Sequence, residues 1–250
     1  DQSNLQNIVQ RFISDKVNLI CAIATPSVQS AANATKEIPI VGTAVTDYVS
    51  AKVVQSSEMP GGNVTGTSDM SPISDQIDLL LKLYPNAKTI GTIYSSSEVN
   101  SEIQVKEMTE YAAAKGLTVR TATISTVNDI PQAAQSLVSD VDVFYEPSDN
   151  VIASAMPTLV SVTDPAGKGV ICAASTMVAA GGLATYGIDY YKLGVQTGEM
   201  AADILEGKRK PSEMKIETAR DLMVVINKKN AEKIGLTIPA DVMDGATIAP

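Results

Sequence analysis

Strand-like runs and helix-length segments alternate along almost all of the 250 residues. Such alternation is typical of βαβ units, in which helices cross over between parallel strands, so we expect an α/β fold. The first half predicts helices over Ser3–Ser14, Ser27–Lys36 and Pro72–Tyr84 and strands over Val17–Ala24, Ile38–Val45 and Asn63–Thr67. The second half predicts helices over Val99–Lys115, Ile130–Val138, Val151–Ala166 and Tyr190–Leu205 and strands over Thr89–Tyr94, Thr118–Ile124, Val141–Tyr145, Gly169–Ala173, Leu183–Tyr186 and Leu222–Asn227.

Three segments of the first half recur in the same order in the second half. VNLICAIATPSVQS resembles VDVFYEPSDNVIAS, EIPIVGTAVTD resembles KGVICAASTMV, and NVTGTSD resembles GLATYGID. Any parallel α/β protein produces some echoes of this kind, but three in one order favour a duplication. The duplication predicts two Rossmann-like lobes with a ligand cleft between them. We expect the first lobe at 1–86, the second at 87–214, and a C-terminal segment at 215–250 that packs on one lobe or both.

The second series opens with a strand–helix–strand, from Lys88 to about Ser125, that the first series lacks. The first series begins instead on the helix that should follow this unit. A complete first lobe is therefore expected to need roughly 40 more residues upstream, which would supply the strand that normally lies centrally in such a sheet.

Composition and motifs narrow the function. The net charge of −9 argues against a surface that binds nucleic acid or anionic lipid. No stretch approaches the roughly 20 apolar residues that cross a bilayer. Histidine is absent, which removes the usual general base and the commonest metal ligand. PGGNVTGTS carries no Lys and is not a phosphate loop. We therefore expect no enzymatic activity, no cofactor and no metal. The two cysteines, Cys21 and Cys172, are expected to be buried free thiols, with a disulfide as the alternative.

Polar side chains follow the predicted strands in both halves, at the ends where ligands collect in parallel sheets. Thr25 suits the N-cap of the next helix and Pro26 its first position. The N-terminus of such a helix favours a carboxylate, whereas a ligand ammonium would suit Asp69 or Asp189. Each residue alone is a common cap. Their recurrence predicts two polar rims that face each other across a gap sized for a free amino acid.

The chain resembles ABC transporter substrate-binding proteins of the tryptophan/tyrosine-binding type in five segments: IATPSVQSAANATKEIPIVGTAVTD, PGGNVTGTSD, TIGTIYSSSEVNS, PSDNVIASAMPTLV and ATYGIDYYKLGVQTGEMA. This resemblance spans nearly the whole chain. It implies a periplasmic-binding-protein-like type I fold whose lobes close on an amino acid, most often tyrosine, tryptophan or phenylalanine. It also implies an extracytoplasmic monomer, in the periplasm or anchored at the cell surface by a lipid outside this chain, that delivers its ligand to a membrane permease.

Carried over position by position, the resemblance implies ligand contacts at Thr25, Ser27, Thr46, Asp47, Asp69, Ser96, Asn100, Ser101, Asp149, Asn150 and Asp189. Glu146 departs from it, because an apolar or small residue is expected there. Four tyrosines near the strand ends would either stack on a ligand ring or pack in the core: Tyr48, Tyr94, Tyr186 and Tyr190.

Two other functions fit the same predicted fold. One is the ligand-sensing domain of a cytoplasmic regulator, which would need an attached DNA-binding or signalling segment. The other is an enzyme on a doubly wound sheet, which would have to rely on carboxylates alone. We rank the enzyme last, since the chain has neither His nor a phosphate loop.

Overall fold

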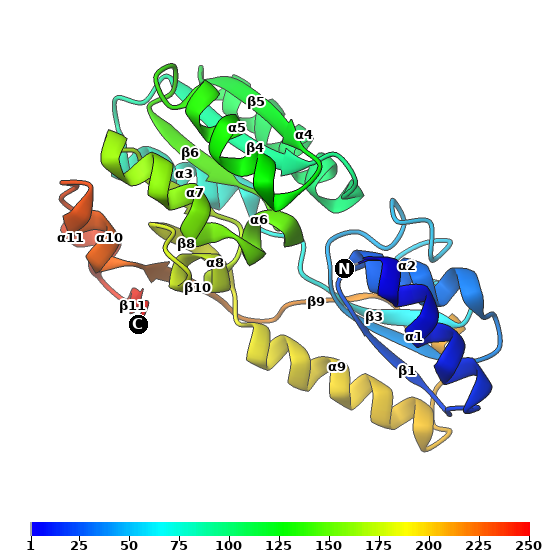
Figure 1. Cartoon of the computed structure of the whole chain (residues 1–250). Coiled ribbons are helices and arrows are strands. Elements are labelled where there is room, and N and C mark those ends of the chain that lie inside the picture. Colours follow the sequence, from blue (N-terminus) through cyan, green and yellow to red (C-terminus); the bar gives the residue numbers. More distant parts are fainter. Residues whose placement is uncertain (1) are drawn as a thin grey trace. The chain divides into compact units, whose positions relative to one another are not determined.

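The computed structural model describes residues 2–250 and divides into two compact units (Figure 1). Unit 1 comprises the chain up to Met70 together with Asp189–Asp221. Unit 2 comprises Ser71–Ile188 and Leu222–Pro250. The chain therefore passes from one unit to the other three times, after Met70, Ile188 and Asp221.

Unit 1 is built on a four-stranded parallel sheet of order β1-β2-β3-β9. Ile40 packs with Val28 in a core beneath α1 and α2, whereas its neighbour Val41 packs with Met200 of α9. Because consecutive strand residues point to opposite faces, the helices cover both faces of the sheet. Its elements are α1 Gln2–Ser14, β1 Ile20–Ile23, α2 Thr25–Ala34, β2 Ile40–Val45, β3 Val64–Ser68, α9 Tyr190–Leu205, η3 Pro211–Glu213 and β9 Glu217–Thr218.

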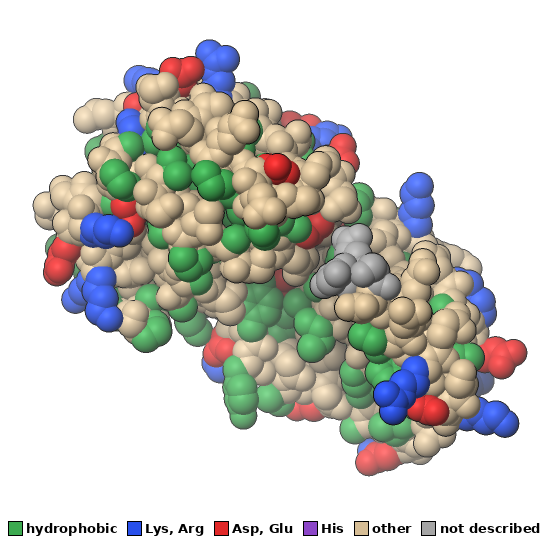
Figure 2. Space-filling view, viewed as in Figure 1, with side chains coloured by type: hydrophobic (Ala, Val, Ile, Leu, Met, Phe, Trp, Pro, Cys, Tyr) green, Lys and Arg blue, Asp and Glu red, His purple; other side chains and the backbone are tan. Residues whose placement is uncertain are grey.

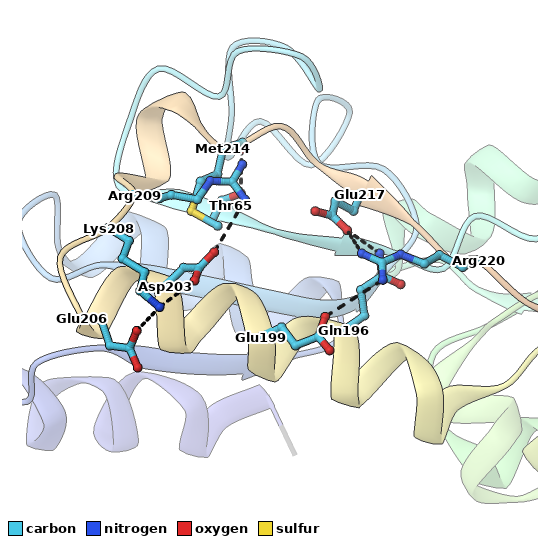
Figure 3. Close-up of polar contacts among 10 residues, drawn as sticks. All are labelled: Thr65, Gln196, Glu199, Asp203, Glu206, Lys208, Arg209, Met214, Glu217 and Arg220. Carbon is cyan, nitrogen blue, oxygen red and sulfur yellow. Dashed lines mark hydrogen bonds and ion pairs between the residues drawn. The ribbon is translucent and has the colours of Figure 1, made fainter.

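Polar contacts attach α9 to the segment that follows it (Figure 3). Gln196 donates to the Glu217 carboxylate over 2.6 Å, and Arg220 pairs with Glu217 at 2.9 Å. Thr65 of β3 donates to the carbonyl of Met214 over 2.7 Å. Since both Thr65 and Met214 are fully buried, this last bond fixes the returning segment on the sheet. The exposed ion pairs around it contribute at most about 1 kcal/mol each.

Unit 2 is built on a seven-stranded sheet of order β11-β10-β8-β7-β6-β4-β5. Only β10 runs antiparallel to β8, and the other pairings are parallel. Its strands are β4 Thr89–Ser95, β5 Thr118–Ile124, β6 Val143–Glu146, β7 Val170–Cys172, β8 Ala184–Ile188, β10 Leu222–Ile226 and β11 Thr247–Ile248. Its helices are α3 Ile73–Leu83, α4 Val99–Ala114, η1 Val127–Asp129, α5 Ile130–Leu137, α6 Asn150–Ser154, α7 Met156–Thr163, η2 Asp164–Ala166, α8 Ser175–Ala179, α10 Lys228–Lys233 and α11 Ala240–Met243.

The unit boundaries differ from the predicted ones at 86 and 214. The strands β1, β2 and β3 match β6, β7 and β8 as the repeat predicts, but the helix after the third strand belongs to the other unit in each case. Helix α3 follows β3 of unit 1 and packs in the core of unit 2, whereas α9 follows β8 of unit 2 and packs in unit 1. The repeat shows which elements correspond, but not which sheet each helix covers.

Most predicted elements form, with one break. The predicted helix over Val151–Ala166 is divided into α6, α7 and η2. Pro157 lies at the start of α7 and has no N–H for the preceding turn, and Ala155 leaves the helical region with φ −129° and ψ 25°. Helix α8, the 3₁₀ turns and the short C-terminal elements are too brief to give a periodic pattern.

Strand β1 lies at an edge of its sheet, and its side chains alternate between buried and exposed. Cys21 is therefore exposed, which corrects the expectation that it is buried, and Ile23 is 67% exposed. Cys172, in the interior strand β7, is buried as expected, and both thiols are free. The expectation of an upstream strand–helix–strand stays a prediction.

Candidate functional site

In unit 1, the rim of the sheet begins where β1 turns into α2. Ala24 is the N-cap, with φ 71° and ψ 154°, and no side chain caps the helix. Thr25, 3% exposed, is the first helical residue, so its predicted N-cap role is wrong by one position. A non-glycine residue in this conformation is strained, and such strain persists where the surroundings impose it, often at ligand sites. Ser27, half-buried, lies in the same first turn.

Asp69, directly after β3, is the most buried carboxyl group of this rim. It is 3% exposed, and the Tyr190 hydroxyl donates to its Oδ2 over 2.7 Å. No hydrogen bond reaches Oδ1, which is buried. Burial raises the pKa of Asp69, while hydrogen bonding by Tyr190 and Thr46 works in the opposite direction. Within the described residues no Lys or Arg forms an ion pair with it. Asp69 thus has an unused acceptor that a cationic donor would satisfy.

The other two predicted carboxylates of unit 1 support local backbone. Asp47 Oδ1 accepts the N–H groups of Val49 and Ser50 at 2.9 and 3.2 Å, and Oδ2 accepts the Ser50 hydroxyl. Asp189 is the N-cap of α9, and its Oδ1 accepts the N–H groups of Tyr191 and Lys192 at 3.0 and 3.2 Å. Asp47 therefore stabilises the turn that follows it, and Asp189 caps a helix, whatever else they contact.

In unit 2, predicted residues from three elements meet at the ends of β4 and β6. Asp149 is fully buried, and its Oδ2 accepts the Ser95 N–H at 2.7 Å and the Ser101 hydroxyl at 2.8 Å. Its Oδ1 accepts the Ile152 N–H at 2.9 Å as the N-cap of α6. Asp149 therefore joins β4, α4 and α6. Ser96 lies beside this cluster but is exposed, with its hydroxyl 3.4 Å from the Ile124 carbonyl.

Glu98 is the central residue that the sequence interpretation missed. It is 3% exposed, and its carboxylate accepts bonds from the N–H groups of Asn150 and Val151 and from the side-chain amides of Asn100 and Asn150. An anion at the start of α6 is favoured by the helix dipole. The first N–H groups of α6 are thus occupied by protein carboxylates. Glu98 stands between serines and a helix in the sequence, where glutamate gives no signal of burial.

Among the described residues, six buried side-chain polar atoms of unit 2 lack a hydrogen-bond partner, and two of them belong to residues of this cluster or next to it. These two are the Oδ1 of Asn100 and the Oγ of Ser148. Asn100 is 3% exposed, and its Nδ2 donates to the Ser148 carbonyl at 3.0 Å. Buried polar atoms are normally paired, so unpaired ones next to a polar cluster indicate capacity for a ligand or water.

Glu146 lies at the end of β6 and is fully buried. Both carboxyl oxygens lie 3.3 Å from the Ile93 N–H of β4. Burial raises the pKa of Glu146 well above its usual value, with the charge of Asp149 adding to the effect. Its departure from the family pattern therefore places a carboxyl group with a raised pKa inside the sheet.

The tyrosines divide between core and rim. Tyr48 is 1% exposed and its hydroxyl donates to the Thr67 carbonyl at 3.0 Å. It fills space left by Gly42 and Gly66, where an added Cβ would lie only 2.5 and 2.4 Å from the Tyr48 hydroxyl oxygen. Tyr48 is therefore a core residue rather than a stacking surface. Tyr190, half-buried, contacts Asp69 instead.

Comparisons with known proteins place this geometry in a family. The sequence profile described as ABC transporter substrate binding protein matches residues 1–248. The chain belongs to the ABC transporter substrate-binding proteins. It is 44% identical over 236 residues to the curated Tyrosine-binding protein of Clostridioides difficile (strain R20291), covering 94% of this chain and 68% of that protein.

Two solved structures extend the similarity. An ABC domain from Streptococcus pneumoniae in complex with L-Trp matches with a TM-score of 0.95 and 41% identity, over 99% of this chain and 84% of that one. The ligand-free, open structure of a substrate binding protein with adhesive properties from Clostridium difficile matches with a TM-score of 0.74 and 43% identity, over 99% and 83%. The α/β fold with mostly parallel sheets agrees with these neighbours.

Substrate-binding proteins of ABC transporters are extracytoplasmic binding components. Across residues 2–250, none of the helices has the length and apolar character to span a membrane. On the face shown in Figure 2, Lys and Arg side chains are interspersed with Asp and Glu rather than gathered in one basic patch.

Proposed function

We propose that this substrate-binding protein captures a free aromatic amino acid, tyrosine, tryptophan or phenylalanine, and delivers it to the permease of its ABC transporter. The observation that carries the proposal is the near-complete match, at 41% identity, to a chain solved with L-Trp. The relative named for tyrosine binding supports the same ligand class. The chain acts as a non-enzymatic monomer, anchored by a lipid outside this sequence or free in the periplasm.

Recognition of the ligand's charged groups is assigned to the two rims. In unit 1, the buried Asp69 Oδ1 accepts from the ammonium group, and the start of α2 with Thr25 and Ser27 binds the carboxylate. Thr46, Asp47 and Asp189 complete the contacts of this rim. In unit 2, Asn100 Oδ1 offers a second acceptor, and the remaining contacts are Ser96, Ser101, Asp149 and Asn150. Among these groups Asp69 combines charge, burial and an unused oxygen, so it should contribute most.

Titration calorimetry tests the ligand class. L-Tyrosine, L-tryptophan and L-phenylalanine should bind with about micromolar affinity, near −8 kcal/mol, and L-leucine and L-glutamate should bind much more weakly. Heat exchange with none of the three aromatic amino acids would overturn the proposed function.

Asp69→Asn tests the assigned ammonium contact. A charge-assisted hydrogen bond is worth roughly 1.5–3 kcal/mol, so this substitution should weaken binding roughly 10- to 150-fold. The matched control is Asp140→Asn, an exposed aspartate of unit 2, which should bind as the wild type does. Equal affinity of the wild type and Asp69→Asn would remove Asp69 from the contact while leaving the ligand class intact.

A further inference from the structure

We propose that Tyr190 is a positioning residue for ligand recognition: its hydroxyl holds Oδ2 of Asp69 so that Oδ1 stays directed to the cationic group of the ligand. This inference rests on the proposed function, because the cation is the ammonium group of the captured amino acid. Tyr190 itself is assigned no ligand contact.

The geometry of the pair is specific. Tyr190 is the first residue of α9 and Asp69 follows β3, so the two come from segments 121 positions apart. The hydroxyl-to-Oδ2 distance of 2.7 Å lies within the range of charge-assisted bonds. Asp69 is 3% exposed, so Tyr190 supplies a donor where water is excluded. The bond holds one carboxyl oxygen and so restricts the rotation of the carboxyl group.

The neighbours of Asp69 leave Tyr190 as its main source of stabilisation. The Tyr48 hydroxyl donates to the Thr67 carbonyl. Burial first, and the charge of Asp69 second, raise the pKa of Tyr48. The Thr46 side chain also favours the ionised form, to a smaller extent than Tyr190. The titratable groups that face Asp69 are thus Tyr190 from α9 and Tyr48 from the segment after β2. Among the ion pairs of residues 2–250, none joins Asp69 to a Lys or Arg.

Two other rim carboxylates, Asp149 and Asp47, lack this asymmetry. Asp149 uses both oxygens on three donors, and Asp47 uses both on its own turn. Only at Asp69, among these three, is one buried oxygen held by a tyrosine and the other unused. This contrast separates a carboxylate positioned for a ligand from carboxylates that hold the fold.

The proposal predicts a shift in the pH dependence of binding. Ammonium recognition needs Asp69 ionised, and burial disfavours the ionised form. Removing the Tyr190 hydroxyl leaves burial less opposed, so the pKa of Asp69 should rise further. Affinity should then begin to fall at a higher pH than in the wild type. A residue that only packs its ring would change affinity equally at every pH.

The experiment compares Tyr190→Phe with Tyr191→Phe, its neighbour in sequence, which is 82% exposed and keeps the same chemistry in the control. Titration calorimetry with L-tyrosine and L-tryptophan from pH 5 to 8 gives each affinity profile. We expect Tyr190→Phe to lose at least about tenfold in affinity at pH 6 and to recover part of it at pH 8, as its profile moves upward. Tyr191→Phe should superimpose on the wild type.

Carboxyl ¹³C titration of the ligand-free protein, with the Asp69 signal assigned by Asp69→Asn, provides a readout that needs no ligand. The midpoint of Asp69 should rise in Tyr190→Phe and stay unchanged in Tyr191→Phe. An unchanged midpoint, or an affinity loss that is equal at all pH values, would overturn the positioning role. If the wild type binds neither amino acid, the proposed function fails, whereas the titration still decides whether Tyr190 controls Asp69.

Discussion

Asp69 of unit 1 and Asp149 of unit 2 are both buried carboxylates placed just after a parallel strand, yet their surroundings differ. Asp149 is saturated: Ser95, Ser101 and Ile152 supply donors to both oxygens. Asp69 is half saturated, with Tyr190 on one oxygen and nothing on the other. A saturated carboxylate stabilises the backbone that donates to it, whereas an unused buried oxygen is a liability for folding that a ligand can remove. Stability and binding should therefore depend on different members of one residue type.

In unit 2, carboxyl groups whose oxygens are hydrogen-bonded support the backbone of β4. The β4–β6 ladder pairs Ile90 with Val143 and Gly91 with Phe144 and then ends. Further along β4, the N–H of Ile93 meets the Glu146 carboxyl and the N–H of Ser95 meets Asp149. Side-chain carboxyl groups thus take the place of strand carbonyls where the two strands separate. Asp149 is consequently a fold residue first, whatever it contributes to the ligand.

The largest expected effect is on stability, from Asp149→Ala. The substitution leaves the Ser95 and Ile152 N–H groups without an acceptor inside unit 2, and each buried unpaired donor costs about 1–3 kcal/mol. We expect the free energy of unfolding to fall by about 3 kcal/mol or more, measured by urea denaturation. Asp69→Ala should lower it by less than Asp149→Ala does, because no backbone N–H of the sheet loses its acceptor and an unpaired buried oxygen is removed. Similar losses in the two variants would break the comparison.

The next effect is on the pH dependence of stability, from Glu146→Gln. The pKa of Glu146 in the folded protein is raised above the ordinary 4.5 by burial first and by Asp149 second. A raised carboxyl pKa gives a stabilising contribution that is complete below pH 4.5 and is lost as pH rises through the folded pKa. In the wild type, the free energy of unfolding should therefore fall as pH rises, by up to about 1.4 kcal/mol per pH unit. Glutamine cannot ionise, so this decrease should be absent in the variant.

Urea denaturation between pH 5 and 8 measures the effect of Glu146→Gln, with Glu232→Gln, an exposed glutamate of α10, as the control. The other titratable groups near Glu146 are Asp149, Tyr145 and the Cys172 thiol, whose pKa is raised by burial first and by Glu146 second. They remain in both variants. A slope that Glu146→Gln leaves unchanged would show that Glu146 stays ionised in the folded protein.

The sequence predicts the framework well because strands and amphipathic helices carry a periodic signal. Thr118–Ile124 and Tyr190–Leu205 were predicted to the residue, and the duplication identifies β1–β3 with β6–β8. The assignment of α3 and α9 to units could not be predicted, because a helix pattern shows which face is apolar but not which sheet covers it.

For the site residues too, the sequence predicts the chemical groups but not the contacts of single atoms. Hydroxyl, amide and carboxyl groups at strand ends are visible in the sequence, and the structure brings Asn100, Ser101, Asp149 and Asn150 into one cluster. Which oxygen is used and which remains unpaired depends on distances of tenths of an ångström between segments far apart in the chain. Hence Glu98 and the Asp69–Tyr190 pair emerge only in the structure.

The smallest expected effect comes from Asp189→Asn. This variant tests which of the two carboxylates, Asp69 or Asp189, binds the ligand's ammonium group. Asparagine caps a helix about as well as aspartate, so the free energy of unfolding should change by only a few tenths of a kcal/mol. Because Asp189 Oδ1 already accepts two N–H groups of α9, affinity for L-tyrosine should fall less than about threefold, far below the loss in Asp69→Asn. Calorimetry on the two variants side by side decides the matter. A tenfold loss in Asp189→Asn would mean that a carboxylate engaged in capping still binds the ligand, and that an unused oxygen is not what distinguishes a binding carboxylate from a structural one.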